Sequence, residues 1–252
     1  MSNGLVGRRR LSSKLIPTAT IIGIVLLFIL VPARRFLFNE NGTLLAVTII
    51  TVAVAALLLG TVFDAKAGFC NAICPVLPVE RLYGQHPLLR IGNPRCIPCR
   101  MCTAEGCIDL VPTLSIANTR GPVHRLPAWL KTPYGVFAAA FPGFVIGYYT
   151  TTDVLLVSAG TIYLSVMAWA GVSYLLTALA VRILNVSVAL ALTILAAGAA
   201  GLYYWFAAPI IASTLGVAGV GTLVIRSAAF VLLVVWFWRA MLKARTHHLE
   251  NK

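Results

Sequence analysis

The chain has 252 residues, of which 60% are hydrophobic and 11% are charged. Soluble domains carry about 25% charged residues, so this composition excludes an ordinary water-soluble domain and indicates that lipid surrounds most of the chain. The formal net charge of +13 does not indicate nucleic-acid binding, because the basic residues lie beside apolar segments, where they set membrane orientation.

Six apolar segments are long enough to cross a bilayer, whose hydrocarbon core of about 30 Å takes about 20 helical residues. In chain order they are about residues 15–31, 43–63, 133–150, 154–179, 186–207 and 222–242. The third is short and contains Pro142 and Gly143, where the helix can kink. Residues 209–221 are apolar but interrupted by glycines, so a surface turn, a re-entrant piece and an early start of the last helix all remain open. The expected fold class is an all-α polytopic membrane protein.

Positive charge is strongly biased to one side of these spans. Seventeen of the 20 lysines and arginines fall in the two termini, the loop after the second span and the connection after the fourth, whereas Arg34 and Arg35 fall on the other side. By the positive-inside rule, both termini and this loop are expected in the cytoplasm of a bacterial-type inner (plasma) membrane. Arg226 lies near the outer end of the last span. It either reaches toward the interface or is a functional charge within the membrane.

The loop after the second span concentrates the chain's reactive residues. All six cysteines lie there: Cys70, Cys74, Cys96, Cys99, Cys102 and Cys107. Clustered cysteines in a chain that is not secreted indicate metal ligands before disulfides. The C-x2-C-x2-C spacing directs three thiolates toward one point, as in ferredoxin [4Fe–4S] sites. Zinc is the alternative, although zinc ligands usually come as separated pairs.

The fourth cluster ligand has two candidates. In a local scheme, Cys107 joins Cys96, Cys99 and Cys102; in a remote scheme, Cys74, which Pro75 follows, takes that place. Six cysteines are too few for two all-cysteine clusters, so we expect one cluster. A second cluster would need ligands such as a histidine, an aspartate or a partner's cysteine. Cys70 and Cys74 also allow a packed pair of thiols or a redox-active pair, which would make the protein a thiol oxidoreductase.

No histidine lies within an expected span. A transmembrane haem held by two histidines of this chain is therefore not expected, and the remaining routes for electrons are a quinone near the cytoplasmic face or a partner subunit. Trp169 lies inside the fourth span. We expect it to pack between helices, with lining of a quinone pocket as the alternative.

The residues between 68 and 111 resemble a known group of proteins. Cys70, Cys74 and Pro75 look like the C-x3-C-P element, and Cys96, Cys99 and Cys102 look like the first ferredoxin ligands, of the membrane-bound polyferredoxins of the NapH/NosR type. That group usually has two such elements and two full ferredoxin motifs, so this chain resembles a reduced form. The resemblance implies electron passage between the quinol pool and partner redox proteins, or support for the maturation of a metalloenzyme.

These inferences combine into one expected organisation. Residues 1–63 hold the first two transmembrane helices, residues 64–132 form the cysteine-rich iron–sulfur loop, and residues 133–252 form a four-helix transmembrane region. The expected function is electron transfer, as a subunit rather than a stand-alone enzyme, between a quinone pool or cytoplasmic donor and a partner redox complex. The expected partners are the bilayer and redox subunits of a membrane complex. The alternative is a membrane scaffold or maturation factor with a structural metal.

Overall fold

The computed structural model describes residues 15–62, 69, 73–84, 125–152, 159–183 and 186–250, which form helices and turns without a strand. The chain divides into two compact units, and each is described by itself. The first contains α1 (Ile16–Ala33), the π-helical turn η1 (Arg34–Phe38), α2 (Gly42–Val62) and α4 (Leu77–Tyr83). The second contains α6 (Leu126–Trp129), α7 (Pro133–Thr150), α8 (Ala159–Ile183) from Tyr163 onward, α9 (Val188–Thr214) and α10 (Val220–Glu250).

Five of the described helices are long and apolar enough to cross a membrane. Their candidate spans are Pro17–Phe38, Gly42–Val62, Ala159–Ile183, Val188–Thr214 and Val220–Leu242. The prediction of an all-helical chain built for a bilayer is therefore confirmed at this level. The expected third span is present as α7, an unbroken helix through Pro142, but α7 is not among these five.

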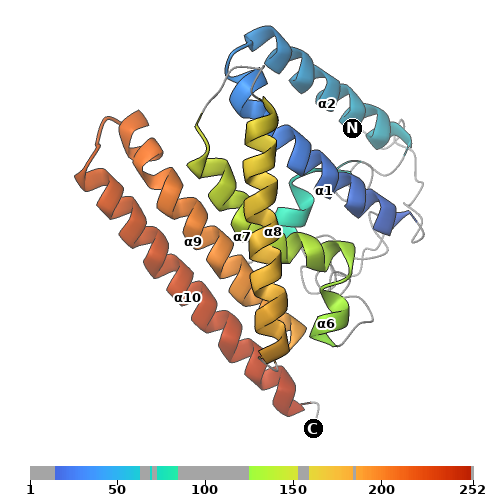
Figure 1. The fold of residues 1–252 in the computed structure, drawn as a ribbon, viewed down its shortest axis with the longest axis vertical. Helices are drawn as coiled ribbons and strands as arrows, with labels where there is room; N and C mark the ends of the chain where they lie inside the picture. The colour runs from blue at the N-terminus through green and yellow to red at the C-terminus, as the bar shows by residue number, and fades with distance from the viewer. Residues whose placement is uncertain are drawn as a thin grey trace, which may run out of the picture. The chain divides into compact units, whose positions relative to one another are not determined.

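In the first unit, α1 runs without interruption into η1, which turns the chain toward α2 (Figure 1). Asn41 begins α2 by accepting hydrogen bonds on its side-chain oxygen from the backbone N–H groups of Thr43 and Leu44, at 3.0 and 3.1 Å. None of the residues of α2 is buried. An apolar helix without a buried face is suited to lipid on all sides.

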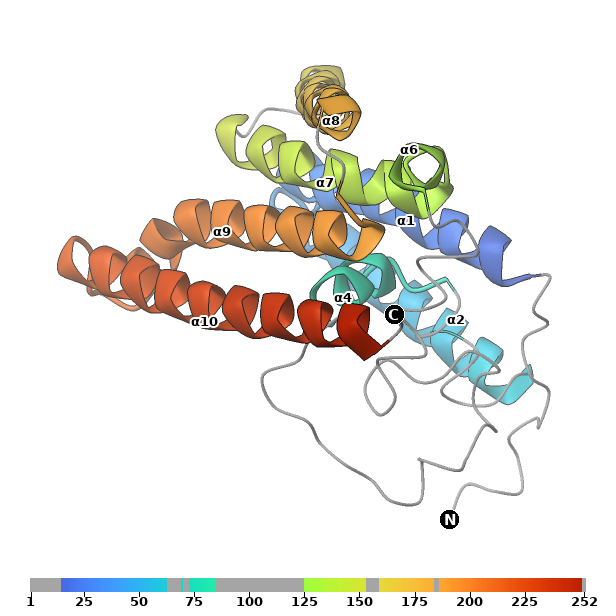
Figure 2. The ribbon, with the colours of Figure 1, turned by 90° about the horizontal axis from the view of Figure 1, so that it is seen from below.

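In the second unit, the helices stand in a row in the order α8, α7, α9, α10 (Figure 2). Eleven of the 18 residues of α7 are buried, which fits its place inside this row. Gly143 and Gly147 of α7 face α8: a Cβ at Gly143 would lie 2.6 Å from the Ser173 Cβ, and one at Gly147 would lie 2.8 Å from the Val166 Cα. The helices therefore approach too closely for any side chain at these two positions, as at other small-residue helix crossings in membranes.

The segment 209–221 combines an extension of α9 with a glycine turn and a start of α10 two residues before the expected residue 222. Helix α9 continues through Pro209 to Thr214, a short turn follows, and α10 begins at Val220. Gly216 and Gly219 have φ angles of +70° and +79° in this turn. These backbone conformations are open to glycine and strained for other residues, which explains why glycine occupies both positions.

Candidate functional site

Cys74 lies in a tight backbone turn that leads into α4. Its N–H donates to the Phe69 carbonyl at 3.2 Å, and its carbonyl accepts from the Leu77 N–H at 3.2 Å. Pro75 is the second residue of the turn that the Leu77 N–H closes on the Cys74 carbonyl, where its fixed φ favours the bend. The thiol is half-buried and is not part of a disulfide, so the backbone around this cysteine is defined while its sulfur remains available as a ligand.

The turn rests directly on α1 at Gly23. A Cβ added to Gly23 would lie 3.0 Å from the Cys74 carbonyl oxygen and 3.6 Å from that of Ile73. Gly23 follows the start of the candidate span at Pro17 by six residues, which is about 9 Å along a helix axis. The Cys74 backbone therefore contacts a membrane-type helix well inside its apolar length.

The short helix α4 holds the other end of this turn. Leu77 and Leu82 are fully buried, and Arg81 is only 6% exposed. The Gly84 N–H closes the helix by donating to the Glu80 carbonyl at 2.7 Å. Because apolar burial of this kind contributes about 1.5–3 kcal/mol for each large side chain, α4 anchors the segment that carries Cys74.

The remaining predicted ligands lie outside the described residues: Cys70, Cys96, Cys99, Cys102 and Cys107. Within the described part of the chain, no group of three or more His, Cys, Asp or Glu side chains is close enough to hold a metal ion. The choice between Cys74 and Cys107 as the fourth ligand, and the number of clusters, therefore stay predictions.

A second polar site joins α9 to α10 within the second unit. Nε and Nη2 of Arg226 both donate to the Trp205 carbonyl, at 3.1 and 2.9 Å. The Arg226 Cζ also lies 4.0 Å from the centroid of the Trp205 ring, a cation–π distance. Arg226 therefore binds the neighbouring helix instead of only reaching toward the interface.

Pro209 explains why the Trp205 carbonyl takes this partner. In a continuous helix, the carbonyl of residue 205 accepts from the N–H of residue 209, and proline has no N–H. Because an unsatisfied carbonyl in hydrocarbon costs several kcal/mol, a donor from another helix is required. Arg226 supplies it, and this pairing explains how α9 continues past a residue that usually ends helices.

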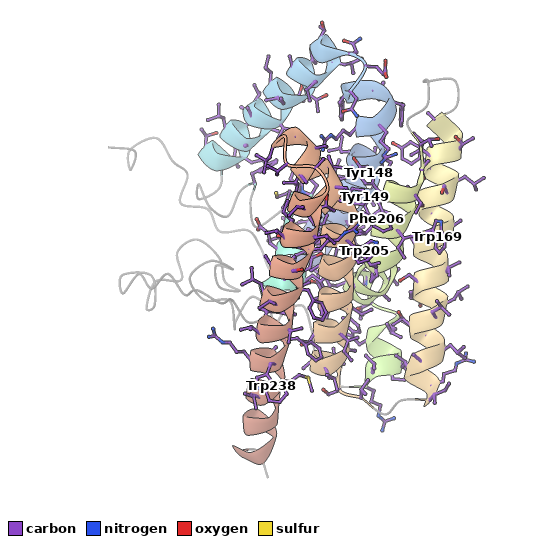
Figure 3. All side chains as sticks on the ribbon, turned by 90° about the vertical axis from the view of Figure 1, so that its left-hand side faces the viewer. Tyr148, Tyr149, Trp169, Trp205, Phe206 and Trp238 are labelled. Carbon is purple, nitrogen blue, oxygen red and sulfur yellow. The ribbon has the colours of Figure 1, made fainter. Side chains whose placement is uncertain are left out.

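Aromatic side chains of α7 and α9 gather near Trp205. We call Tyr148 and Tyr149 of α7, with Tyr203, Tyr204 and Phe206 of α9, the aromatic cluster. The Tyr149 ring stacks on that of Phe206 with centroids 5.5 Å apart, and it meets the Tyr203 ring edge-on at 6.0 Å. Figure 3 shows Tyr148, Tyr149 and Phe206 close to Trp205, with Trp238 toward the opposite end of α10. Tyrosine and tryptophan gathered at one level are typical of a membrane–water interface.

Trp169 lies at the α7–α8 crossing and also lines an open cavity. Its backbone carbonyl lies against Gly143 of α7, so Trp169 is part of the α7–α8 crossing. The same residue lines an open cavity of about 290 Å³ together with Ser173, Thr177 and residues of α7 and α9. Ser173 donates its hydroxyl to the Ala139 carbonyl at 2.7 Å, which leaves mainly apolar walls.

The sequence alone identified neither the contact of Cys74 with Gly23 nor that of Arg226 with Trp205. Gly23 is one glycine in an apolar helix, and nothing local shows that the Cys74 turn rests on it. Pro209 and Arg226 did carry a signal, because a proline inside an apolar segment frees a carbonyl four residues earlier and an arginine in a span needs an acceptor. No known protein family, no characterised protein and no solved structure matches this chain.

Proposed function

We propose that the chain is a membrane-bound iron–sulfur electron-transfer protein that works between a quinone pool or a cytoplasmic donor and a partner redox complex. The observation that carries the proposal is the C-x2-C-x2-C spacing of Cys96, Cys99 and Cys102. The position of Cys74 supports it, because this candidate ligand rests on α1 inside an apolar span.

The ligand chemistry fits one [4Fe–4S] cluster. Cys96, Cys99 and Cys102 would supply three thiolates, and either Cys107 or Cys74 would supply the fourth. Such a cluster carries one electron at a time when bound. Cys74 meets two requirements of a ligand, since its thiol is partly accessible and not consumed in a disulfide. The two backbone hydrogen bonds that fix its turn would hold the sulfur in place.

The membrane arrangement belongs to the same proposal. We take α7 as the sixth span, enclosed by other helices, and place both termini and the cysteine-rich loop in the cytoplasm of a bacterial-type inner membrane. With the loop between the second and third spans, the Cys74 backbone would then lie about 9 Å inside the cytoplasmic end of α1, within reach of a quinone in the bilayer.

The proposal is tested by assaying iron and acid-labile sulfide in anaerobically purified protein. We expect about four of each per chain for one [4Fe–4S] cluster. The variants Cys74→Ser and Cys107→Ser separate the two ligand sets, because the true fourth ligand loses most of the iron and the other cysteine does not. Cys70→Ser tests the remaining candidate ligand in the same assay. One zinc and no iron per chain would contradict electron transfer and favour a structural metal in a scaffold or maturation factor.

A further inference from the structure

An open groove of about 400 Å³ lies between α9 and α10 beside Arg226. Its polar side chains are those of Arg226, Ser227 and Tyr204, and most of its remaining walls are apolar. Gly201 contributes no side chain on the α9 face, where a Cβ would meet only the Leu233 Cδ1 at 3.9 Å. One end of the groove therefore carries a cation and two hydroxyl groups, and the rest of the groove is apolar.

Arg226 retains hydrogen-bonding capacity toward this groove. A guanidinium has five N–H donors, and the two bonds to the Trp205 carbonyl use one from Nε and one from Nη2. Among the described residues, no further hydrogen bond or ion pair is made by Arg226. The sequence between residues 154 and 249 contains no Asp or Glu, so α9 and α10 offer no carboxylate at this level to neutralise the charge.

A hydrocarbon core taken to begin at Val188, the start of α9, places the groove close to one boundary of the bilayer. Trp205, which Arg226 contacts, is 17 residues after the start of α9 at Val188, or about 26 Å along the helix. A hydrocarbon core of about 30 Å that begins at Val188 therefore ends about one helical turn beyond Arg226. The aromatic cluster packs around the same part of α9, as expected for an interface.

The apolar residues of the groove continue in the direction of the membrane centre. Phe230, Val231 and Leu233 line it and follow Arg226 by one to two turns toward the basic C-terminal end of α10. Phe230 is 67% exposed, so its ring is open to an acyl chain. A bound molecule with an anionic head at Arg226 and an apolar tail along Phe230 would match both the charge and the depth of this groove.

We propose that this groove binds an anionic phospholipid, with the headgroup phosphate at Arg226 and one acyl chain along α10. Arg226 donates its remaining N–H groups to the phosphate oxygens, the geometry for which the guanidinium fork is suited. Ser227 and Tyr204 lie at the same end and offer hydroxyl donors. The site is independent of the proposed iron–sulfur function, because it uses only α9 and α10.

The test separates lipid binding from the structural role of Arg226. In Pro209→Ala/Arg226→Met, the new N–H at position 209 satisfies the Trp205 carbonyl, so α9 keeps its hydrogen bonding while the cation is absent. Purified protein in dodecyl maltoside is titrated with phosphatidylglycerol, phosphatidylcholine or inorganic phosphate, and bound lipid is counted by native mass spectrometry. Pro209→Ala alone and Arg182→Met, which removes an exposed arginine from α8, are the matched controls.

We expect the two controls to bind phosphatidylglycerol as the wild type does, and the double variant to bind it about tenfold or more weakly, the change expected for a lost hydrogen bond to a charged group. Gly201→Leu, which fills the groove and leaves Arg226 in place, weakens binding in the same direction. Equal binding by the double variant and the wild type would overturn the proposal. Binding of phosphatidylcholine equal to that of phosphatidylglycerol would also overturn it. So would binding of inorganic phosphate as tight as that of phosphatidylglycerol.

Discussion

The pairing of Arg226 with the carbonyl that Pro209 leaves open makes a quantitative prediction about stability. Arg226→Met removes both hydrogen bonds to Trp205 and the cation–π contact. Hydrogen bonds from a charged donor contribute about 1.5–3 kcal/mol, whereas polar contacts measured inside membranes reach only about 1.7 kcal/mol. We therefore expect a loss of about 1–3 kcal/mol in the free energy of unfolding.

The same substitution in a Pro209→Ala background costs less, because alanine restores a backbone N–H at position 209 and this N–H donates to the Trp205 carbonyl. The predicted coupling between the two positions is about 1 kcal/mol or more, well above the roughly 0.3–0.5 kcal/mol within which independent sites add. Unfolding in mixed micelles of dodecyl maltoside and sodium dodecyl sulfate measures all four members of the cycle. Equal losses in both backgrounds would refute the account, and Arg182→Met, at the exposed end of α8, serves as the neutral control.

Two further predictions concern the glycines. Gly143→Leu places a side chain against the Ser173 Cβ and the Trp169 carbonyl, so we expect a loss of about 3 kcal/mol or more in the free energy of unfolding. The control Gly171→Leu meets nothing within 4 Å and changes this free energy by about 0.5 kcal/mol or less. Equal effects of the two substitutions would contradict the close α7–α8 crossing. Gly23→Leu pushes the Cys74 turn off α1, so maleimide labels Cys74 faster in a chain whose other cysteines are serine, and an unchanged rate would contradict this packing.

The helices were largely predictable because membrane helices follow directly from long apolar runs. The expected segment 133–150 coincides with α7, and the expected start of α9 at residue 186 lies two residues from Val188. That α7 makes a close helix crossing was also readable in principle, since Gly143 and Gly147 have the G-x3-G spacing of such crossings. Gly143 was interpreted only as the site of a kink with Pro142, and its packing role was missed.

The end of α9 could not be predicted from local sequence. Proline usually marks a helix boundary, so the expected span stops at residue 207, whereas α9 continues to Thr214. The donor that permits this extension, Arg226, is 21 residues away and belongs to a different helix. The contact of Cys74 with Gly23 could not be predicted either, because the two residues are far apart in sequence. A glycine in an apolar helix indicates a close approach without identifying the segment that approaches.

We propose that the cysteines hold a redox-active iron–sulfur cluster, and electron paramagnetic resonance detects such a cluster through its unpaired electron. Anaerobically purified protein is measured before and after reduction with dithionite. The account predicts a signal that appears on reduction and integrates to about one spin per chain, from a [4Fe–4S] cluster with about four irons. Protein that contains iron and sulfide but shows no change on reduction, or that contains zinc in their place, would contradict it.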